Sequence, residues 1–407
     1  MDPVPSQRRR LPPAAAFPLL ATVLFAYFMA ASAPSPLFIV FQQQWGFSSS
    51  LLTVAFAIYA IALLLSLLVA GSLSDHIGRR PVMLVALFMQ TLAMLMFLWA
   101  RGIGGLIAAR VVQGIATGLA SGALTAAVVE AAPTSQKRLG ALISSVSPLA
   151  GLAVGALLTG ITVKLVGHAV PLVFGTLAAV VVLGAVGVLF VPETAAPRPG
   201  AWRSLVPRMA VPVRARGPFL RAAPALVTTW ALGGLFLSLV PSLLRDVFGV
   251  HDGVVNGSAI ATLFGFGALA PMLLSRFGPA RAGAFGMTVI VFGIGAMTAS
   301  FSNASLLLFF IGAAVGGVGF GTAFSAQIQI LAPLADSHER AELFASIYVM
   351  SYLAFSVPAM AAGLLIAPFG LLQTVRGYAL VLLVLGSIGA VLQWFALRNA
   401  GRASPAR

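Results

Sequence analysis

Cysteine is absent from the 407 residues, so the chain can form no disulfide bond, thiolate metal site or cysteine nucleophile. Histidine is scarce, and its positions are too scattered for a zinc or haem cluster: His76, His168, His251 and His338. The sequence also lacks a phosphate-binding glycine loop and a catalytic triad. We therefore expect no metal, no cofactor and no enzymatic activity.

Charge is also scarce, since only 8% of the residues are charged and 60% are apolar. A soluble domain carries about 25% charged residues, so this chain cannot face water on all sides. The mean hydropathy of +1.03 agrees, and a lipid bilayer is the expected surrounding. The net charge of +15 would suit a nucleic-acid partner, but the basic residues lie in short connectors between apolar runs. We expect no nucleic-acid binding.

Long apolar runs dominate the sequence. A helix needs about 20 apolar residues to cross a bilayer, whereas barrel strands are about ten residues long and alternate. The runs therefore predict an all-α membrane protein with twelve transmembrane helices, over residues 17–41, 52–71, 82–100, 104–128, 139–163, 170–191, 222–244, 256–275, 283–301, 305–331, 341–366 and 373–396.

A polar segment, residues 195–221, divides the chain near its middle and contains five prolines and six arginines. It predicts a linker between two six-helix bundles, with the domains 1–16 (tail), 17–194 (first bundle), 195–221 (linker), 222–396 (second bundle) and 397–407 (tail). The simplest role of the linker is a tether that also sets the topology. Its arginines would also suit anionic lipid headgroups, and this alternative stays open.

The orientation follows from the positions of lysine and arginine. With the N-terminus inside, nineteen of the 24 basic residues fall in cytoplasmic segments, and only Arg101, Lys164, Arg245 and Arg376 fall outside. This asymmetry predicts an inner-membrane protein with both termini in the cytoplasm. Ala31-Ser32-Ala33 could end a cleaved leader, but the preceding apolar run exceeds the usual core of about 7–15 residues. We expect an uncleaved first span.

The strongest motif is the loop Gly71–Pro81, which matches the pattern G-x-L-x-D-x-x-G-R-[RK] at every position. It resembles the first inner loop of the major facilitator superfamily, and the length, span number and central linker of the chain fit that family. The resemblance implies the major facilitator fold and a gating role, with an ion pair at Asp75, for Gly71, Leu73, Asp75, Gly78, Arg79 and Arg80. A simple topology anchor is the alternative.

The fourth span contains Arg110, Gln113 and Gly114, which resemble the R-x-x-Q-G pattern of the same family. An arginine in hydrocarbon costs at least about 2.5–3.5 kcal/mol, so we predict that Arg110 points into a central cavity. Gln113 shares its helix face. Snorkelling of Arg110 to the outer surface is the alternative.

The fifth span carries Pro148, Gly151 and Gly155, similar to the G-P-x-x-G-G motif of the family's exporters with departures at Ser147 and Leu152. Proline can kink a helix and glycine permits close packing. Glu130 and Arg138 flank the preceding connector and form a candidate inner charge pair, although Glu130 could also contact the Asp75 loop.

The two halves show a faint repeat at an offset of 200 residues, in which Gly278 corresponds to Gly78. The second half has Ser275, Pro279 and Ala280 where aspartate and two arginines stand in the first. We therefore expect a charge lock in the first half only.

The resemblance implies a secondary transporter of a small solute that works by alternating access, most similar to twelve-span bacterial drug and metabolite exporters. No carboxylate lies near the middle of a span, so coupling to protons is implied by the resemblance alone. Efflux of amphipathic compounds by a monomer is the leading prediction; uptake of a sugar, organic acid or other metabolite, and a non-transporting receptor or scaffold, are the alternatives. Candidate cavity residues are Tyr27, Arg110, Gln113, Trp230, Gln327 and Gln329.

Overall fold

The computed structural model describes residues 10–196, 198–207, 209–336 and 339–402, most of them helical. The described helices, in chain order, are α1 (Pro13–Ser32), α2 (Pro34–Trp45), α3 (Ser49–Ala70), α4 (Leu73–Ile77), α5 (Arg79–Trp99), α6 (Ile103–Ala131), η1 (Thr134–Gln136), α7 (Lys137–Leu165), α8 (Ala169–Phe190), α9 (Ala201–Ser204), α10 (Val213–Ser238), α11 (Val240–Asp246), α12 (Gly253–Leu273), α13 (Pro279–Asn303), α14 (Leu306–Leu331), η2 (Ala332–Leu334), α15 (Arg340–Phe369) and α16 (Leu371–Arg402).

Within the described residues, twelve helical segments are long and apolar enough to cross a membrane, as the sequence predicts. The first of these segments joins α1 and α2 through Ala33, whose backbone stays right-handed helical. Large apolar side chains such as Phe88, Leu183 and Leu380 are more than 60% exposed, as expected of a surface that faces lipid. The chain is a multi-pass membrane protein of the all-α class.

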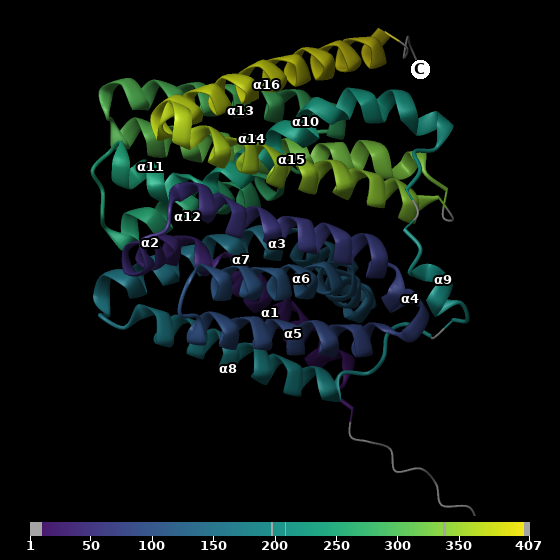
Figure 1. Ribbon diagram of the computed structural model, residues 1–407. Coiled ribbons are helices and arrows are strands. Elements are labelled where there is room, and N and C mark those ends of the chain that lie inside the picture. The colour runs from purple at the N-terminus through teal and green to yellow at the C-terminus, as the bar shows by residue number, and fades with distance from the viewer. Residues whose placement is uncertain (1–9, 197, 208, 337–338, 403–407) are drawn as a thin grey trace, which may run out of the picture.

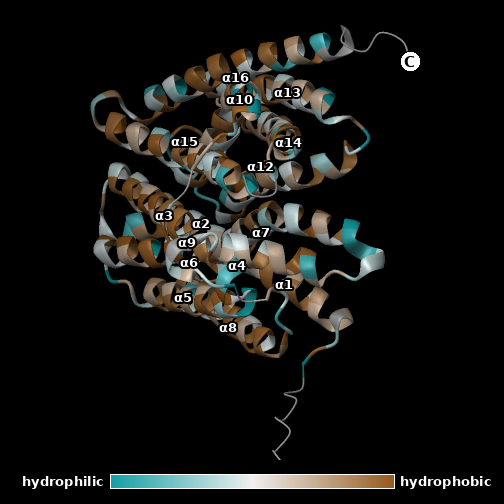
Figure 2. Cartoon of the chain, turned by 90° about the vertical axis from the view of Figure 1, so that its right-hand side faces the viewer, coloured by the Kyte–Doolittle hydropathy of each residue, from teal (hydrophilic) through white to brown (hydrophobic). Residues whose placement is uncertain are grey.

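The helices form two bundles, with α1–α8 in one and α10–α16 in the other (Figure 1). Figure 2 looks onto the end that holds both described termini and shows the two bundles stacked, with hydrophobic residues along α5, α8 and α16. We call this the near end, formed by residues 71–78, 132–136, 191–196, 198–207, 209–212, 274–278 and 332–336. The opposite, far end is formed by residues 46–48, 100–102, 166–168, 247–252, 304–305 and 370.

The connection between the bundles is shorter than residues 195–221, because α10 already begins at Val213. Arg214, Arg216 and Arg221 therefore lie on the first turns of a helix. Their side chains are exposed, and such long side chains can reach the polar interface while the helix continues into the apolar layer. The charge of such arginines does not show from the sequence whether they belong to the first turns of a membrane helix or to a linker.

Glycines set the packing within the bundles. A Cβ atom on Gly151 would meet Phe28 Cβ at 2.8 Å and Met29 N at 3.2 Å, so α7 lies directly against α1 there. Gly155 makes the same approach one turn later, against Met29 and Ser32. Pro148 lies inside α7, which continues through it. Lipid tails are as apolar as the helices, so burial of apolar surface does not drive helices together in a bilayer. Small residues allow the close van der Waals contact that does.

Candidate functional site

The loop at the near end of the first bundle turns at Gly78, whose φ of +100° favours glycine. The neighbouring space also requires glycine, because a Cβ atom there would lie 2.6 Å from Glu193 Oε2. Glu193 fills the space that Gly78 leaves open and accepts hydrogen bonds from Arg79 N (2.7 Å) and Arg80 N (3.0 Å). These are the first N–H groups of α5, where a carboxylate is favoured by the helix dipole.

The guanidinium of Arg79 contacts two further acids of the first bundle, Asp75 and Glu130. It forms an ion pair with Asp75, lies 3.0 Å from Glu130 Oε1 and donates to Ser74 Oγ at 2.7 Å. Thr194 Oγ1 donates to Glu130 Oε2 at 2.6 Å. The structure thus ties the α3–α5 loop to the ends of α6 and α8, all within one bundle.

The pairing of Glu130 differs from the predicted pair with Arg138. Glu130 contacts Arg79, while its backbone carbonyl accepts from Lys137 Nζ at 3.1 Å and Arg138 is exposed. The sequence left contact with the Asp75 loop open, and that alternative is the one found. Of the other loop residues, Gly71 ends α3 and Leu73 packs against the core.

The second bundle has a different arrangement at the corresponding loop. Gly278 has a φ of −60°, and nothing lies within 4 Å of a Cβ atom placed on it. At the near end of this bundle, the described ion pairs lie instead between Arg214 and the acids Asp336 (2.5 Å) and Glu339 (3.0 Å), before α15. All three side chains are about a third or more exposed, so the pairs contribute little to stability.

Arg110 is buried inside the first bundle, with 1% of its surface exposed. Its partners are all neutral: Gln113 Oε1 at 2.6 Å and Ala55 O at 3.4 Å. The guanidinium carbon also lies 4.2 Å from the ring centre of Tyr59, with Phe38 and Phe56 at 5.5 and 5.9 Å. Neither snorkelling nor exposure to an open cavity describes this position, because aromatic rings enclose the charge.

Gln113 and Gly114, which follow Arg110 in the motif, have different structural roles. Gln113 orients the guanidinium and donates from Nε2 to Ala30 O at 3.0 Å, which links α6 to α1. Gly114, a candidate substrate or coupling residue from the motif, packs against α3, where an added Cβ atom would meet Ala62 Cβ at 2.8 Å. Its role here is close helix contact.

Aromatic side chains form a seam where the two bundles meet. Phe56 of α3 lies 4.9 Å from Phe355 of α15, measured between ring centres. Trp230 of α10 continues the seam, with ring distances of 4.7 Å to Tyr352, 5.5 Å to Phe324 and 5.9 Å to Phe355. The structure therefore places Trp230 next to Phe355, one ring from the contact between the bundles, and its buried Nε1 has no hydrogen-bond partner among the described residues.

Gln327 does not join this seam, contrary to the prediction. Its Oε1 accepts from Gln393 Nε2 at 3.2 Å, and its amide lies against Gly283, between α13, α14 and α16. Gln329 is exposed and donates to Ser325 Oγ at 3.1 Å. Tyr27 is fully buried in α1. The rotation of each helix decides which polar residue faces the partner bundle, and the apolar pattern of a membrane helix does not fix that rotation.

Polar contacts between the bundles gather at the far end. Lys164 Nζ of α7 lies 2.7 Å from Asp252 Oδ2 at the start of α12. Arg245 Nη1 donates to Gln42 Oε1 at 3.0 Å, and Ser50 Oγ donates to Gly363 O at 2.7 Å. These contacts close the far end in this conformation.

Asp252 has a double role at that closure. Its Oδ1 caps α12 by accepting from Val254 N (2.8 Å) and Val255 N (3.3 Å), while Oδ2 faces Lys164. The hydrogen bond from Lys164 is the main cause of a lowered pKa for Asp252, and the two backbone N–H groups add to it. The helix cap does not depend on the contact between bundles.

Close backbone contact supports the ion pair. A Cβ atom on Gly257 of α12 would lie 2.5 Å from Ala156 O of α7, and one on Gly253 would lie 2.5 Å from Gly160 O. Sequence reasoning missed this closure. The spacing of four residues between Gly253 and Gly257 is the signal that could have indicated it, together with opposite charges on the connectors holding Lys164 and Asp252.

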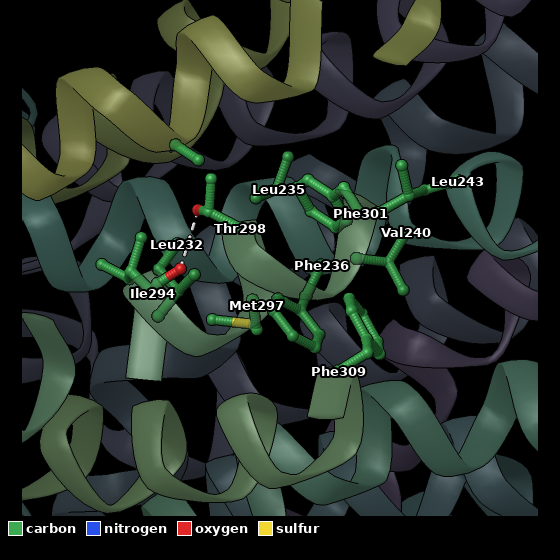
Figure 3. Close-up of a pocket in the computed structure, with 11 residues that line it drawn as sticks. Leu232, Leu235, Phe236, Val240, Leu243, Ile294, Met297, Thr298, Phe301 and Phe309 are labelled. Carbon is green, nitrogen blue, oxygen red and sulfur yellow. Dashed lines mark hydrogen bonds between the residues drawn. The ribbon is translucent and has the colours of Figure 1, made fainter. Parts of the chain in front are cut away.

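Two cavities elsewhere are unsuited to the solute site. An apolar void of about 10 Å³ lies inside the second bundle. Figure 3 shows residues that line it, such as Leu232, Phe236 and Met297, and its dashed line is the Thr298 Oγ1 bond to Ile294 O. The void is apolar and barely the size of one water molecule. The other, of about 220 Å³, lies among α1, α5 and α8, where exposed Leu183 faces outward.

Comparison with family models matches residues 20–291 to the Major Facilitator Superfamily. The chain belongs to this superfamily. As a superfamily member it is a secondary transporter of a small-molecule solute and not an enzyme.

Solved structures share the fold of this major facilitator protein. A POT family transporter in complex with 5-aminolevulinic acid aligns with a TM-score of 0.74 at 12% identity, over 96% of this chain and 97% of that chain. The human organic anion transporter MFSD10 (TETRAN) aligns with a TM-score of 0.67 at 16% identity, over 93% and 100%. These identities establish the shared fold alone. None of the curated proteins compared with the sequence matches it.

Proposed function

We propose that this transporter exports small amphipathic solutes by alternating access of its two bundles. The observation that carries the proposal is the aromatic seam of Phe56, Trp230, Tyr352 and Phe355, which joins the bundles beside the buried charge of Arg110. Aromatic faces with few polar groups suit solutes that are partly apolar.

The contacts of the two ends support alternating access. The far end is held by contacts between the bundles, of which Lys164–Asp252 is the one ion pair among the described residues. The near-end network of Arg79, Asp75 and Glu130 lies within one bundle. Rocking of rigid bundles would break the far-end contacts and keep the near-end network intact.

Export driven by protons is the finer part of the proposal and rests on the resemblance to exporters. None of the described carboxylates is buried, so a proton carrier must act at a helix end. Asp75, Glu130 and Asp246 are the candidates, and the first two already share Arg79. Protonation of either acid would weaken its pairing with Arg79.

Reconstituted vesicles test the function. A thermal-stabilisation screen of the purified chain first selects a solute, whose counterflow is then measured with and without a pH gradient. We expect saturable counterflow at zero gradient and accumulation in vesicles when the gradient drives protons out. Counterflow with no response to the gradient removes proton coupling, and no counterflow of any stabilising solute contradicts the transport assignment to this seam.

A further inference from the structure

Arg110 is the one charged side chain that is buried among the described residues. The described acids lie at helix ends or in connectors, and the side chains of Asp75, Glu130 and Asp252 are each about a third or more exposed. The described membrane interior therefore carries a positive charge and no negative one. A cation that entered it would meet repulsion without a carboxylate to balance its charge.

The charge of Arg110 is not compensated within the protein. Its described hydrogen bonds go to the neutral oxygens of Gln113 and Ala55 through Nη1 and Nε, and it takes part in none of the described ion pairs. Removing a charge from water without a counterion is costly, and aromatic faces offset only part of that cost. An anion close to Arg110 would be stabilised, because none of the described carboxylates pairs with the guanidinium.

The aromatic seam is one ring away from this charge. Phe56 lies beside Arg110 on one side and contacts Phe355 of the other bundle. Trp230 lies next to Phe355 and keeps a buried N–H donor without a partner. The seam thus offers aromatic faces and a spare donor in the field of a buried cation, which fits a planar ring that bears an oxygen anion.

From this arrangement we propose that the transported solute is an aromatic or planar organic monoanion, recognised through Trp230 and the field of Arg110. The inference rests on the proposed transport function and adds the sign of the solute's charge to it. The rival chemistry is an organic cation held by cation–π contacts with the same rings. The two chemistries predict opposite effects of the Arg110 charge on binding. The charge attracts an anionic solute and repels a cationic one.

Three probes with one ring system and different charges separate these cases: 2-naphthoate, 2-naphthamide and 2-naphthylmethylammonium. The readout is the thermal midpoint of the full chain in lipid nanodiscs as each probe is titrated. We expect naphthoate to bind at a concentration at least about tenfold lower than the ammonium probe, the size of effect typical of one charge-assisted contact. An equal or stronger response to the ammonium probe, or binding of none of the three, overturns the proposal.

Variants assign the preference to the named residues. Arg110→Gln should remove the preference for naphthoate and leave naphthamide binding unchanged, whereas a preference retained in this variant overturns the role of Arg110. If Arg110→Gln does not fold, Trp230→Phe provides the test, because it keeps the ring but removes the N–H donor. We expect it to weaken naphthoate binding by about threefold to tenfold. Trp202→Phe, at an exposed position of α9, is the matched control and should change nothing.

Counterflow of the same probes distinguishes this inference from the transport function. Naphthoate binding with the expected charge preference but without counterflow would remove the transport assignment and keep the charge preference of the site. Counterflow of the ammonium probe in preference to naphthoate would support the transport function and contradict the proposal that the solute is an anion.

Discussion

At the scale of single residues, Gly78 and Gly278 show how one sequence feature can have two outcomes. Both follow the second span of their bundle, yet Gly78 has a φ of +100° against Glu193, and Gly278 has a φ of −60° in open space. The sequence identified Gly78 as part of the gating motif. It did not identify Glu193 as the side chain in contact, because that residue lies more than 100 positions away in the chain.

Gly78→Ala is therefore expected to destabilise the near end by at least about 1–3 kcal/mol, from backbone strain and displacement of Glu193. Gly278→Ala is the matched control and should be neutral. Thermal midpoints of the two purified variants measure the difference. Equal midpoints would show that the contact between Glu193 and α5 does not constrain the loop.

At the scale of helices, length and hydropathy were sufficient to predict the twelve spans, because crossing a bilayer imposes both. Helix rotation and partner choice were not predictable in the same way. Gln327 faces Gln393 inside its bundle, and α7 packs on α12 through glycines as well as through the Lys164–Asp252 ion pair. Such contacts depend on which small residues of two helices meet. A single sequence shows that the small residues are present but not which of them are in contact.

The contact of α7 with α12 gives a prediction for the far end. Lys164→Met or Asp252→Asn should raise the fraction of molecules with an open far end, by a modest amount because both side chains are about a third or more exposed. Lys164→Arg should leave that fraction unchanged, and Asn can still cap α12 through its side-chain oxygen. Since the chain has no cysteine, spin labels at His168→Cys and His251→Cys, both exposed, report the far-end distance. Equal distance distributions in all variants would exclude this ion pair as a closure.

The pH response of this closure follows from the pKa of Asp252. That pKa is lowered by Lys164 in the closed arrangement, so the pair contributes fully above the usual aspartate range and is lost as the pH falls through the lowered value. The label distance should stay unchanged between about pH 6 and about pH 8 and lengthen only below about pH 4. A transition near pH 6 would point to another titrating group.

At the scale of the whole molecule, the described chain begins and ends at the near end, with α9 between the bundles at the same end (Figure 1). An even number of spans requires this arrangement, and the excess of arginine there predicts a cytoplasmic location. The two bundles meet through the aromatic seam in the interior and through polar and glycine contacts at the far end. We expect transport to require these far-end contacts to open and close.

Reversible cross-linking of the far end tests this requirement. Lys164→Cys and Asp252→Cys, introduced together into the cysteine-free chain, can be joined by a short cleavable thiol cross-linker in reconstituted vesicles. Counterflow of the solute should stop when the two positions are joined and recover when the linker is cleaved, with either single variant unaffected by the reagent. Counterflow at the uncross-linked rate with the far end fully joined would contradict alternating access between these bundles.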